Sequence, residues 1–473
     1  MKRAEVWTPA REHRRTTGSR SGHPLRIAHF LASLGAASFA VAATDPNAQS
    51  EYSRPRDAAD SQIAVDDVDA QVTAARARAA EDPWALAEAL TSLGDALLLK
   101  RDYSGAEAAY GEALQIATQR EGANSTRTLE PLRGLGYALA GSQRHDEAVP
   151  YMERALTMAR AQRGVFDPEQ MELLHRLSDS LTALGRQGEA ERHMLYTLRL
   201  AEGTYGEGDP RVASAVCALG DWFTAVFRPI SARYAYQVAL DIVAHGVGAD
   251  DLAAVEPLRG YARIDMQVVS YPEFALRTRG KKGKYAVDTH GHTLTGERKL
   301  TPEGESALKR ALAILEAHGR DAPRQTLIDT LVQLGDWYQI KRLPREALPY
   351  YQRAWTLMTA DRSQGTPGEF SFPVRVFYPT PTIAAPRPPA ATARDAQFVQ
   401  VEFTVDADGG VSAARIVDHD TSKRFAGQVL GAVRGARYRP KLVDGQPVAT
   451  AAVRYREVLY VSAPAPAPAE SGG

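Results

Sequence analysis

Cysteine and net charge are the first things that this sequence lacks. Cys217 is the single cysteine among 473 residues, so the chain has no internal disulfide and no metal site built from a cysteine cluster. The 57 Lys and Arg residues balance 57 Asp and Glu residues, which leaves no global attraction to nucleic acid or anionic lipid. Phosphate-loop, nucleophile-elbow and zinc-protease motifs are also missing. We therefore predict no enzyme, no cofactor, no metal site and no nucleic-acid partner.

Long apolar runs are missing too, apart from one near the amino terminus. That run reads IAHFLASLGAASFAVAA and ends in small residues. A basic start, a short apolar stretch and a small-residue end are typical of a secretory signal. We predict a signal peptide over residues 1–43, cleaved after Ala42 or Ala43, and a lead-in over 44–80. The alternative is a retained membrane anchor, for which the run is short. The basic start consists of Arg3, Arg11, Arg14, Arg15, Arg20 and Arg26.

A repeat of forty-two residues runs through the middle of the chain. Its clearest sign is Leu-Gly-Asp, which occurs at 93–95, 219–221 and 334–336. A period of this length, filled with helically spaced apolar residues, predicts a solenoid of helical hairpins. The small residues Gly94, Gly136, Ser178, Gly220 and Ala262 follow one another at intervals of forty-two.

Small residues have a physical purpose at these offsets. Two antiparallel helices approach closely only where side chains at their crossing are small, which explains Gly94 on the first helix and Ala106 on the second. Tyr110 then fills the space between one hairpin and the next, and Ala113 lets the next unit stack. A single hairpin cannot bury its apolar face, so the units must come in series.

These offsets resemble the tetratricopeptide repeat (TPR) family, in a long-helix form. The resemblance covers residues 81–360 and implies about six hairpins in a right-handed superhelix with a groove for peptides or proteins. Within it, residues 275–303 form an insertion that displaces the second helix of the fifth unit. Alternation around His290-Gly291-His292 predicts a basic β-hairpin there. Two histidines in one turn are a poor metal site without further ligands.

The carboxyl-terminal part changes from helical to alternating periodicity. Residues 361–395 are rich in proline and predict an extended linker. Residues 396–462 then predict a hairpin of two strands, a short helix from Lys423 to Arg434 and a long last strand from Ala451 to Val461. Residues 463–473 predict a disordered tail. The fold class is therefore α + β multidomain, an α-solenoid followed by a small α+β domain.

The residues of this last domain resemble the carboxyl-terminal domain of TonB proteins. The shared features are VxFxVDxDGxV at 401–411, the segment ARYRPKLVDGQPV and the closing strand. The resemblance implies a periplasmic domain that binds a peptide by strand addition at a sheet edge, with outer-membrane transporters among the partners. The last strand is the expected edge, with a slip in its alternation near Glu457. Its candidate residues are Val453, Tyr455, Val458 and Tyr460.

Charged residues recur on the first helices of the predicted hairpins. The aspartates of Leu-Gly-Asp follow the small residue, where a TPR-like helix looks into the groove. With repeated glutamates nearby and arginines as opposing charges, the groove is expected to be mostly acidic. It would favour a basic or an extended neutral peptide. The candidate groove residues are Asp95, Arg133, Tyr137, His175, Asp179, Asp221, Arg259, Arg263 and Asp336.

Three functions are consistent with this sequence. We favour a periplasmic protein-interaction scaffold with a TPR groove and a strand-adding module. The alternative is a TonB-like energy transducer for outer-membrane transport, which needs a retained anchor in the inner membrane. An enzyme with a site in the 275–303 insertion is the third, and it lacks a recognisable acid–base or nucleophile set. Membrane association is expected only if the amino-terminal segment is retained.

Overall fold

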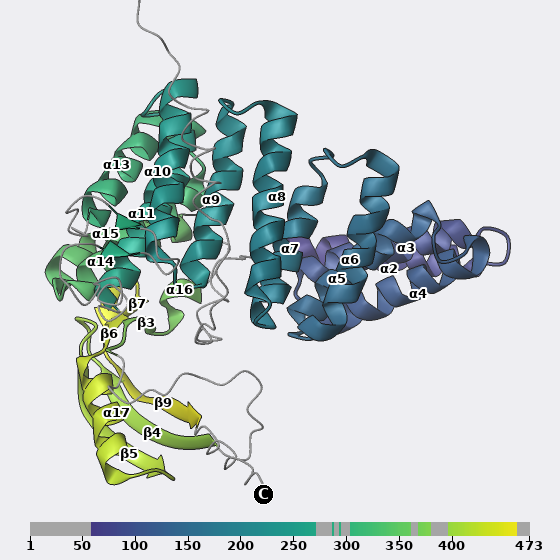
Figure 1. Ribbon diagram of the computed structural model, residues 1–473. Coiled ribbons are helices and arrows are strands. Elements are labelled where there is room, and N and C mark those ends of the chain that lie inside the picture. The colour runs from purple at the N-terminus through teal and green to yellow at the C-terminus, as the bar shows by residue number, and fades with distance from the viewer. Residues whose placement is uncertain are drawn as a thin grey trace, which may run out of the picture.

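The computed structural model describes residues 58–270, 286–287, 293–294, 303–360, 368–379 and 396–460. The predicted signal peptide, most of the proline-rich linker and the predicted tail lie outside the described residues. Figure 1 shows a long array of helices joined at one end to a small sheet domain. The same array changes direction along its length, since α3 and α4 lie across the view of Figure 1 and α8 to α10 stand upright.

The helical array consists of antiparallel pairs, preceded by α2 (Ala58–Ala77), which packs on α3. Each pair is one repeat, and neighbouring pairs also contact each other. The pairs among the described residues are α3 (Pro83–Leu99) with α4 (Tyr103–Glu121), α5 (Leu129–Gly141) with α6 (His145–Arg163), α7 (Gln170–Ala183) with α8 (Gln187–Tyr205), α9 (Pro210–Ala225) with α10 (Pro229–Gly246), α11 (Val255–Ser270) with α13 (Gly304–His318), and α14 (Arg324–Ile340) with α15 (Pro344–Thr359).

The turns within the hairpins and the turns between them repeat with the same period as the helices. In each of the first four hairpins, a residue with left-handed backbone conformation lies in the turn between the two helices. A glycine with positive φ follows the second helix. Such a residue after a helix redirects the chain and lets it satisfy the last free carbonyls. The turns inside hairpins use Arg101, Gln143, Gly185 and Phe227, and those between hairpins use Gly122, Gly164, Gly206 and Gly248.

A tyrosine held between two glycines joins one hairpin to the next. A Cβ atom on Gly94 would lie 2.6 Å from the Tyr110 ring, and one on Gly134 of the following hairpin would lie 2.3 Å from it. Gly260 stands in the same relation to Tyr236 three repeats later, at 2.2 Å. The tyrosine is fully buried, so its volume is accommodated by removing side chains from both neighbouring helices.

The insertion interrupts the fifth pair without separating its helices. α13 packs against α11 as the second helix of a hairpin, although their ends are more than thirty residues apart in sequence. Between them, β1 (Ala286–Val287) pairs antiparallel with β2 (Thr293–Leu294). The predicted basic stem and the two histidines of its tip lie outside the described residues.

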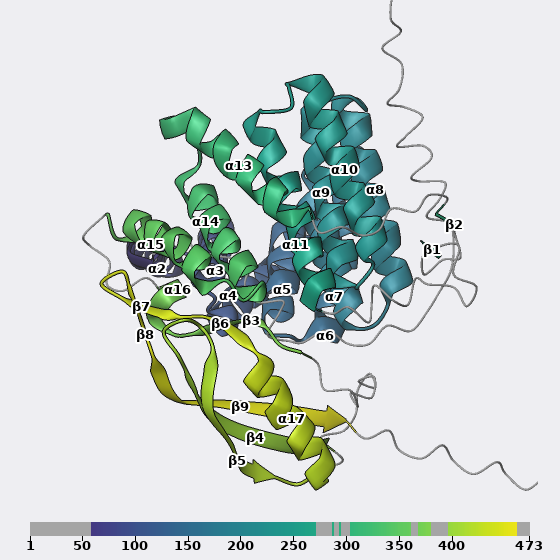
Figure 2. The same ribbon diagram turned by 90° about the vertical axis from the view of Figure 1, so that its left-hand side faces the viewer.

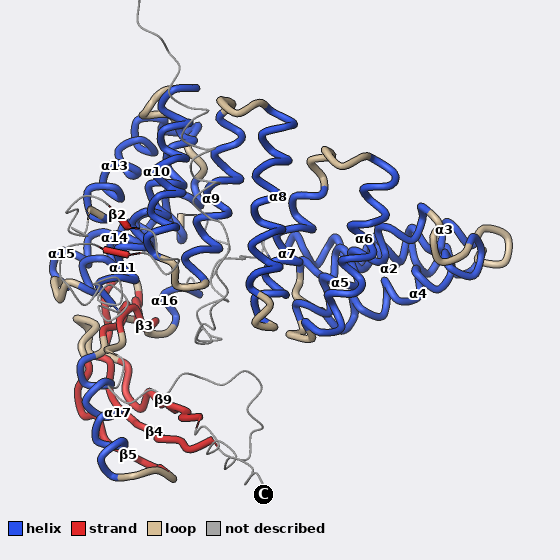
Figure 3. Tube along the Cα trace, viewed as in Figure 1, coloured by secondary structure: helices blue, strands red, loops and turns tan. Residues whose placement is uncertain are grey.

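The carboxyl-terminal domain is a three-stranded antiparallel sheet with one helix on a face. The strand order is β5-β4-β9, and α17 covers one side (Figure 2). Two smaller pairs, β3 with β6 and β7 with β8, connect this sheet to the helices (Figure 3). The elements are α16 (Gly368–Ser371), β3 (Val374–Phe377), β4 (Ala396–Val405), β5 (Val411–His419), α17 (Lys423–Gly435), β6 (Arg437–Arg439), β7 (Lys441–Val443), β8 (Gln446–Val448) and β9 (Thr450–Tyr460).

The predicted slip near Glu457 is wrong. β9 pairs with β4 without interruption from Tyr460 opposite Ala396 to Val453 opposite Phe403. Glu457 therefore shares the inner face with Tyr455, because side chains alternate along an unbroken strand. It accepts hydrogen bonds there from the hydroxyls of Tyr455 and Tyr378. Val458 falls on the opposite face and is 39% exposed. A carboxylate with two phenolic donors can take an inward position that a charge pattern alone does not suggest.

Candidate functional site

Each of the three Leu-Gly-Asp aspartates accepts a hydrogen bond from a tyrosine in the second helix of its own hairpin. Asp95 accepts from the Tyr110 hydroxyl at 2.6 Å, and Asp221 accepts from Tyr236 at 2.5 Å. Burial and the adjacent carboxylate raise the pKa of both tyrosines. Asp336 accepts from Tyr351 in the same way, at 2.7 Å.

These pairs give the recurrence of the aspartates a structural cause that the sequence analysis missed. In each case the tyrosine stands fifteen residues after the aspartate, and that constant offset was the available signal. In the second and third hairpins, Met152 and Met194 occupy the repeat position of this tyrosine, so no hydroxyl donor is present. The position after the small residue is then Tyr137 or Asp179.

The aspartates differ in what else they contact. Asp95 is exposed. Asp221 pairs with Arg263 of the next hairpin, with 2.5 Å between the carboxylate and Nη1. Asp336 is buried at 9% exposure and pairs with Arg439 of the carboxyl-terminal domain. The sequence predicts that Asp336 faces a binding partner, but in the structure Arg439 of the same chain binds its carboxylate.

The candidate residues of α5, α7, α9 and α11 lie along one surface, which we name the first-helix surface (Tyr137, His175, Asp179, Asp221 and Arg263). Asp179 is exposed to solvent, yet protein surrounds its carboxyl group closely enough that burial, helped by Asp221, raises its pKa to about 6. Burial lowers the pKa of His175. Its Nε2 atom has no hydrogen-bond partner among the described residues. The buried polar atoms of this surface without a partner among the described residues include His175 Nε2 and the Tyr137 hydroxyl, and such atoms are uncommon in folded proteins.

The predicted opposing arginines are engaged with carboxylates of their own. Arg133 pairs with Glu130 at 2.5 Å. Arg259 is buried and forms two ion pairs, with Glu256 at 3.0 Å and with Asp329 at 3.6 Å. The Tyr137 ring lies under Arg176, 4.7 Å from the guanidinium carbon. Because these arginines already have carboxylate or aromatic partners, the exposed Asp179 and the unpartnered His175 Nε2 are the stronger candidates for recognition.

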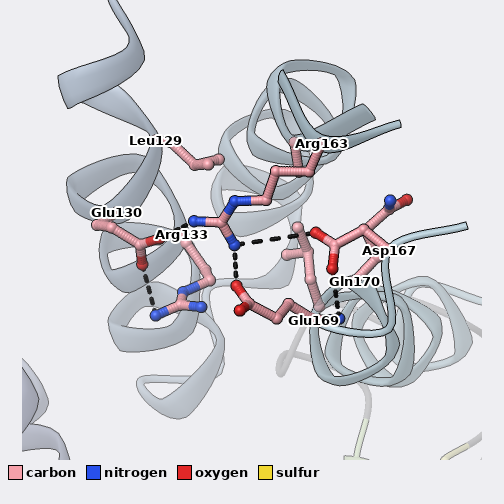
Figure 4. Close-up of a pocket in the computed structure, with 9 residues that line it drawn as sticks. Leu129, Glu130, Arg133, Arg163, Asp167, Glu169 and Gln170 are labelled. Carbon is pink, nitrogen blue, oxygen red and sulfur yellow. Dashed lines mark hydrogen bonds and ion pairs between the residues drawn. The ribbon is translucent and has the colours of Figure 1, made fainter. Parts of the chain in front are cut away.

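A small cavity between α5 and α7 is too narrow for a ligand (Figure 4). Its volume is about 10 Å³, which is the space of a single water molecule. Arg163 lies across it, 3.6 Å from Glu130 and 3.9 Å from Asp167, and also pairs with Glu169. A wider open cleft of about 540 Å³ lies between α4 and α6. The charges at its rim are paired, since Arg144 binds Glu107 of α4 across the cleft and also binds the neighbouring Glu147 of α6.

The carboxyl-terminal domain docks directly on the last helical pair. The Arg439 guanidinium contacts the Asp336 carboxylate twice, with Nε 3.0 Å from Oδ1 and Nη2 2.7 Å from Oδ2. Leu442 of β7 is fully buried in the apolar cluster that includes Trp337 and Tyr351. The Gln339 side-chain amide donates to the Asp408 carbonyl at 3.1 Å, and that of Gln352 donates to the Gly445 carbonyl at 3.1 Å.

This domain takes the place that a further repeat would occupy. Asp221 receives Arg263 from the next hairpin, and Asp336 receives Arg439 from β6. The ring of Tyr351 packs edge-on against Phe370, 5.9 Å between centroids, where Tyr236 packs against the next hairpin. A solenoid needs such a cap because its last unit has no neighbour to cover its apolar face.

β9 lies at an edge of the sheet and, in the described part of the chain, pairs with β4 alone. Val453 and Tyr455 are half-buried on the side of α17. Val458 lies on the outer face, and the side chain of Tyr460 is outside the described residues. The edge residues are therefore in an extended strand with one unpaired side. An extended peptide adds to a sheet at an edge of this kind.

Three further observations concern chemistry. No helix in the described ranges is both long enough and apolar enough to cross a membrane. No cluster of three potential metal ligands occurs within those ranges either. Cys217 is buried, and burial raises the pKa of its thiol, which disfavours the reactive thiolate.

Comparison with known proteins identifies both parts of the chain. The tetratricopeptide repeat family matches residues 85–161, and the family described as the Gram-negative bacterial TonB protein C-terminal matches residues 388–456. No curated protein matches significantly.

Among solved structures, BtubC (BKLC) from P. vanneervenii is 18% identical, with a TM-score of 0.35 over 71% of this chain and 98% of that one. A putative kinesin light chain with nearly identical TPR-like repeats from Podospora anserina is 14% identical, with a TM-score of 0.38 over 49% of this chain and 96% of that one. The quorum sensor NprR from B. thuringiensis is 13% identical, with a TM-score of 0.34 over 63% of this chain and 83% of that one.

The array of hairpins and the docked sheet domain agree with the two family matches, and both families are of a scaffold type rather than a catalytic one. The chain thus contains a tetratricopeptide repeat region at residues 85–161 and a TonB-type carboxyl-terminal domain at residues 388–456, a combination that suggests a protein-interaction scaffold.

Proposed function

We propose that this protein is a periplasmic interaction scaffold with no catalytic activity of its own. One binding region is the first-helix surface, where the Asp179 side chain is exposed and His175 Nε2 has no hydrogen-bond partner among the described residues. The other is the edge of β9, which adds an extended peptide as a further strand. The partners are proteins or peptides of the cell envelope, outer-membrane transporters among them. Export by the predicted signal peptide brings the chain to them.

The observation that carries this proposal is the placement of β9. The carboxyl-terminal domain uses β6, β7 and the turn at Asp408 to dock on α14 and α15. Its opposite part, the edge of β9, stays unpaired among the described residues. Docking therefore fixes the edge relative to the helices without covering it. Two binding regions held on one body bind a common partner more tightly than either does alone.

The experiment is site-specific photo-crosslinking in cells. A photoreactive amino acid is placed at Asp179 for the first-helix surface and at Val458 for the edge. The matched control is Arg192 on α8, whose side chain is 73% exposed. We expect the first two positions to capture discrete envelope proteins that the control does not capture. Equal capture at all three positions, or none at Asp179 and Val458, would contradict the proposal.

A TonB-like energy transducer is the alternative, and the match of residues 388–456 favours it. Such a protein must keep its amino-terminal segment as an anchor in the inner membrane. Fractionation and amino-terminal sequencing of the mature chain separate the two functions. We expect a chain that begins near Thr44 in the periplasmic fraction. An intact amino terminus in the inner-membrane fraction would contradict the periplasmic scaffold and support the energy transducer.

A further inference from the structure

The outer face of β9 carries two arginines in alternate positions, Arg454 and Arg456. Arg454 is 66% exposed at its side chain and lies 3.0 Å from Glu402 of β4. Glu402 also receives Arg415 from β5, so one carboxylate serves two guanidinium groups. Arg456 lies over the Phe398 ring, 3.8 Å from its centroid, and has no carboxylate partner among the described residues. The edge therefore carries an excess of positive charge.

The inner face of the same edge has a different character. Val453 and Tyr455 are half-buried against the core of the domain. Glu457 lies beyond them and already accepts two phenolic hydrogen bonds. The Tyr378 ring and the Arg375 guanidinium pack on Tyr455, 5.4 Å and 4.7 Å from the centroid of its ring. A strand next to β9 would thus meet arginines on the outer face, and Val453 with this aromatic cluster on the inner face.

β9 is also the better of the two sheet edges for adding a strand. Its pairing with β4 is regular from Val453 to Tyr460. The one register shift of β9 and its left-handed residue Ala452 lie at its beginning, before this regular stretch. The pairing of β5 with β4 shifts register twice within the strand, and β5 contains the left-handed residue Ala413. Bulges of this kind twist an edge away from a new partner, so the regular edge is the one open to pairing.

We infer that the β9 edge selects a partner strand with acidic residues in alternate positions and apolar residues between them. This inference rests on the strand addition proposed above and specifies its ligand. Side chains directly across two antiparallel strands lie about 5 Å apart, and opposite charges there attract. Acidic side chains opposite Arg454 and Arg456 would supply the carboxylates that the edge lacks. The apolar residue between them would pack beside Tyr455.

The same charges disfavour pairing of β9 with a second copy of itself. Two β9 strands would bring arginines from both copies together along one edge, and like charges across strands repel. Charged side chains on an edge commonly prevent such self-association. A partner of opposite charge is therefore the occupant that fits this edge, and a homodimer is the arrangement that it resists.

The test uses the full chain and three fluorescent nine-residue peptides. One alternates Glu and Val, and the other two have Gln or Lys in place of Glu. We expect fluorescence anisotropy to show that the Glu peptide binds about tenfold more tightly than the Gln peptide. The Lys peptide should bind more weakly still, and added salt should reduce the difference.

Two matched variants locate the effect. Arg456→Gln on β9 and Arg415→Gln on β5 remove the same charge from the same sheet face. We expect Arg456→Gln to weaken the Glu peptide about two- to fivefold and Arg415→Gln to leave the order of the three peptides unchanged. The charge reversal Arg454→Glu with Arg456→Glu should make the Lys peptide the tightest binder.

The outcomes distinguish this inference from the function on which it rests. If none of the peptides binds, strand addition at β9 fails together with the inference. If all three bind equally, or if Arg456→Gln changes nothing, strand addition stands and the charge preference is wrong. If Arg454→Gln with Arg456→Gln turns the chain into a dimer that binds no peptide, the arginines only guard the edge and the inference is overturned.

Discussion

Arg439 and Asp336 are 103 residues apart in sequence and form a bidentate ion pair in a buried interface. The guanidinium group comes from the sheet domain and the carboxylate from the last helical pair. Both side chains are about nine-tenths buried. Removing charges from water is costly, and a two-point contact with good geometry is what offsets that cost. The pair therefore acts as the specific link between the two parts of the chain.

Breaking this link should destabilise the protein strongly. Asp336→Ala leaves the Arg439 guanidinium buried without its carboxylate and the Tyr351 hydroxyl without its acceptor. We expect a loss of about 3–5 kcal/mol in the free energy of unfolding, measured by urea denaturation. The matched control is Asp95→Ala, at the same repeat position but exposed and without an arginine partner in the described residues; it removes only the acceptor of the Tyr110 hydroxyl and should cost about 1–2 kcal/mol. Similar losses for the two variants would contradict the assignment of the interface.

Overpacking at a helix crossing should also destabilise the array. A Cβ atom on Gly220 would lie 2.9 Å from the Tyr236 ring, so Gly220→Leu must displace a buried aromatic residue. We expect a loss of about 1–3 kcal/mol or more, seen as a lower midpoint of thermal unfolding. Gly111→Ala in α4 is the control, because nothing lies within 4 Å of its new methyl group. That change should stabilise the helix by about 0.5–1 kcal/mol. An unchanged midpoint for Gly220→Leu would disprove the crossing.

Stability should depend on pH through Asp179. Its pKa in the folded chain is about 6, above the ordinary value of 3.8, so between these pH values the folded chain binds more protons than the unfolded one. Stability therefore falls as pH rises from about 4 to about 6. Asp179→Asn should be more stable than the parent above pH 6 and equal to it below pH 4. Asp179→Glu keeps a titrating carboxyl and is the control. A parallel pH profile for Asp179→Asn and the parent would refute this effect.

The insertion between α11 and α13 should be dispensable for folding. These two helices pack against each other as the fifth hairpin, so their contact does not depend on the sequence that joins them. Replacing residues 277–300 by a short Gly-Ser turn should leave the helical circular dichroism per residue and the melting temperature nearly unchanged. Deleting α13 itself is the control and should lower the melting temperature sharply. Loss of folding after the first replacement would show that the insertion belongs to the core.

The repeated part of the fold is determined by the sequence itself. Small residues at intervals of forty-two, with an aromatic residue sixteen after Gly94, Gly220 and Gly335, predict hairpins that cross closely and stack. The strands and helix of the last domain follow from their local periodicity in the same way. This information is readable because each unit contacts mainly its sequence neighbours. The turn residues repeat with the same period, a signal that the sequence analysis did not use.

The tertiary structure alone decided which groups meet across long distances in sequence. Asp95, Asp221 and Asp336 occupy one position of the repeat, yet the first is exposed, the second pairs within the array and the third pairs with Arg439. The charge pattern predicts a slip in the alternation near Glu457, whereas in the structure Glu457 accepts hydrogen bonds from Tyr455 and Tyr378. Periodicity fixes the face on which a side chain lies. The partner on that face depends on the docking of elements that no local pattern connects, and the burial of charge makes that choice energetically decisive.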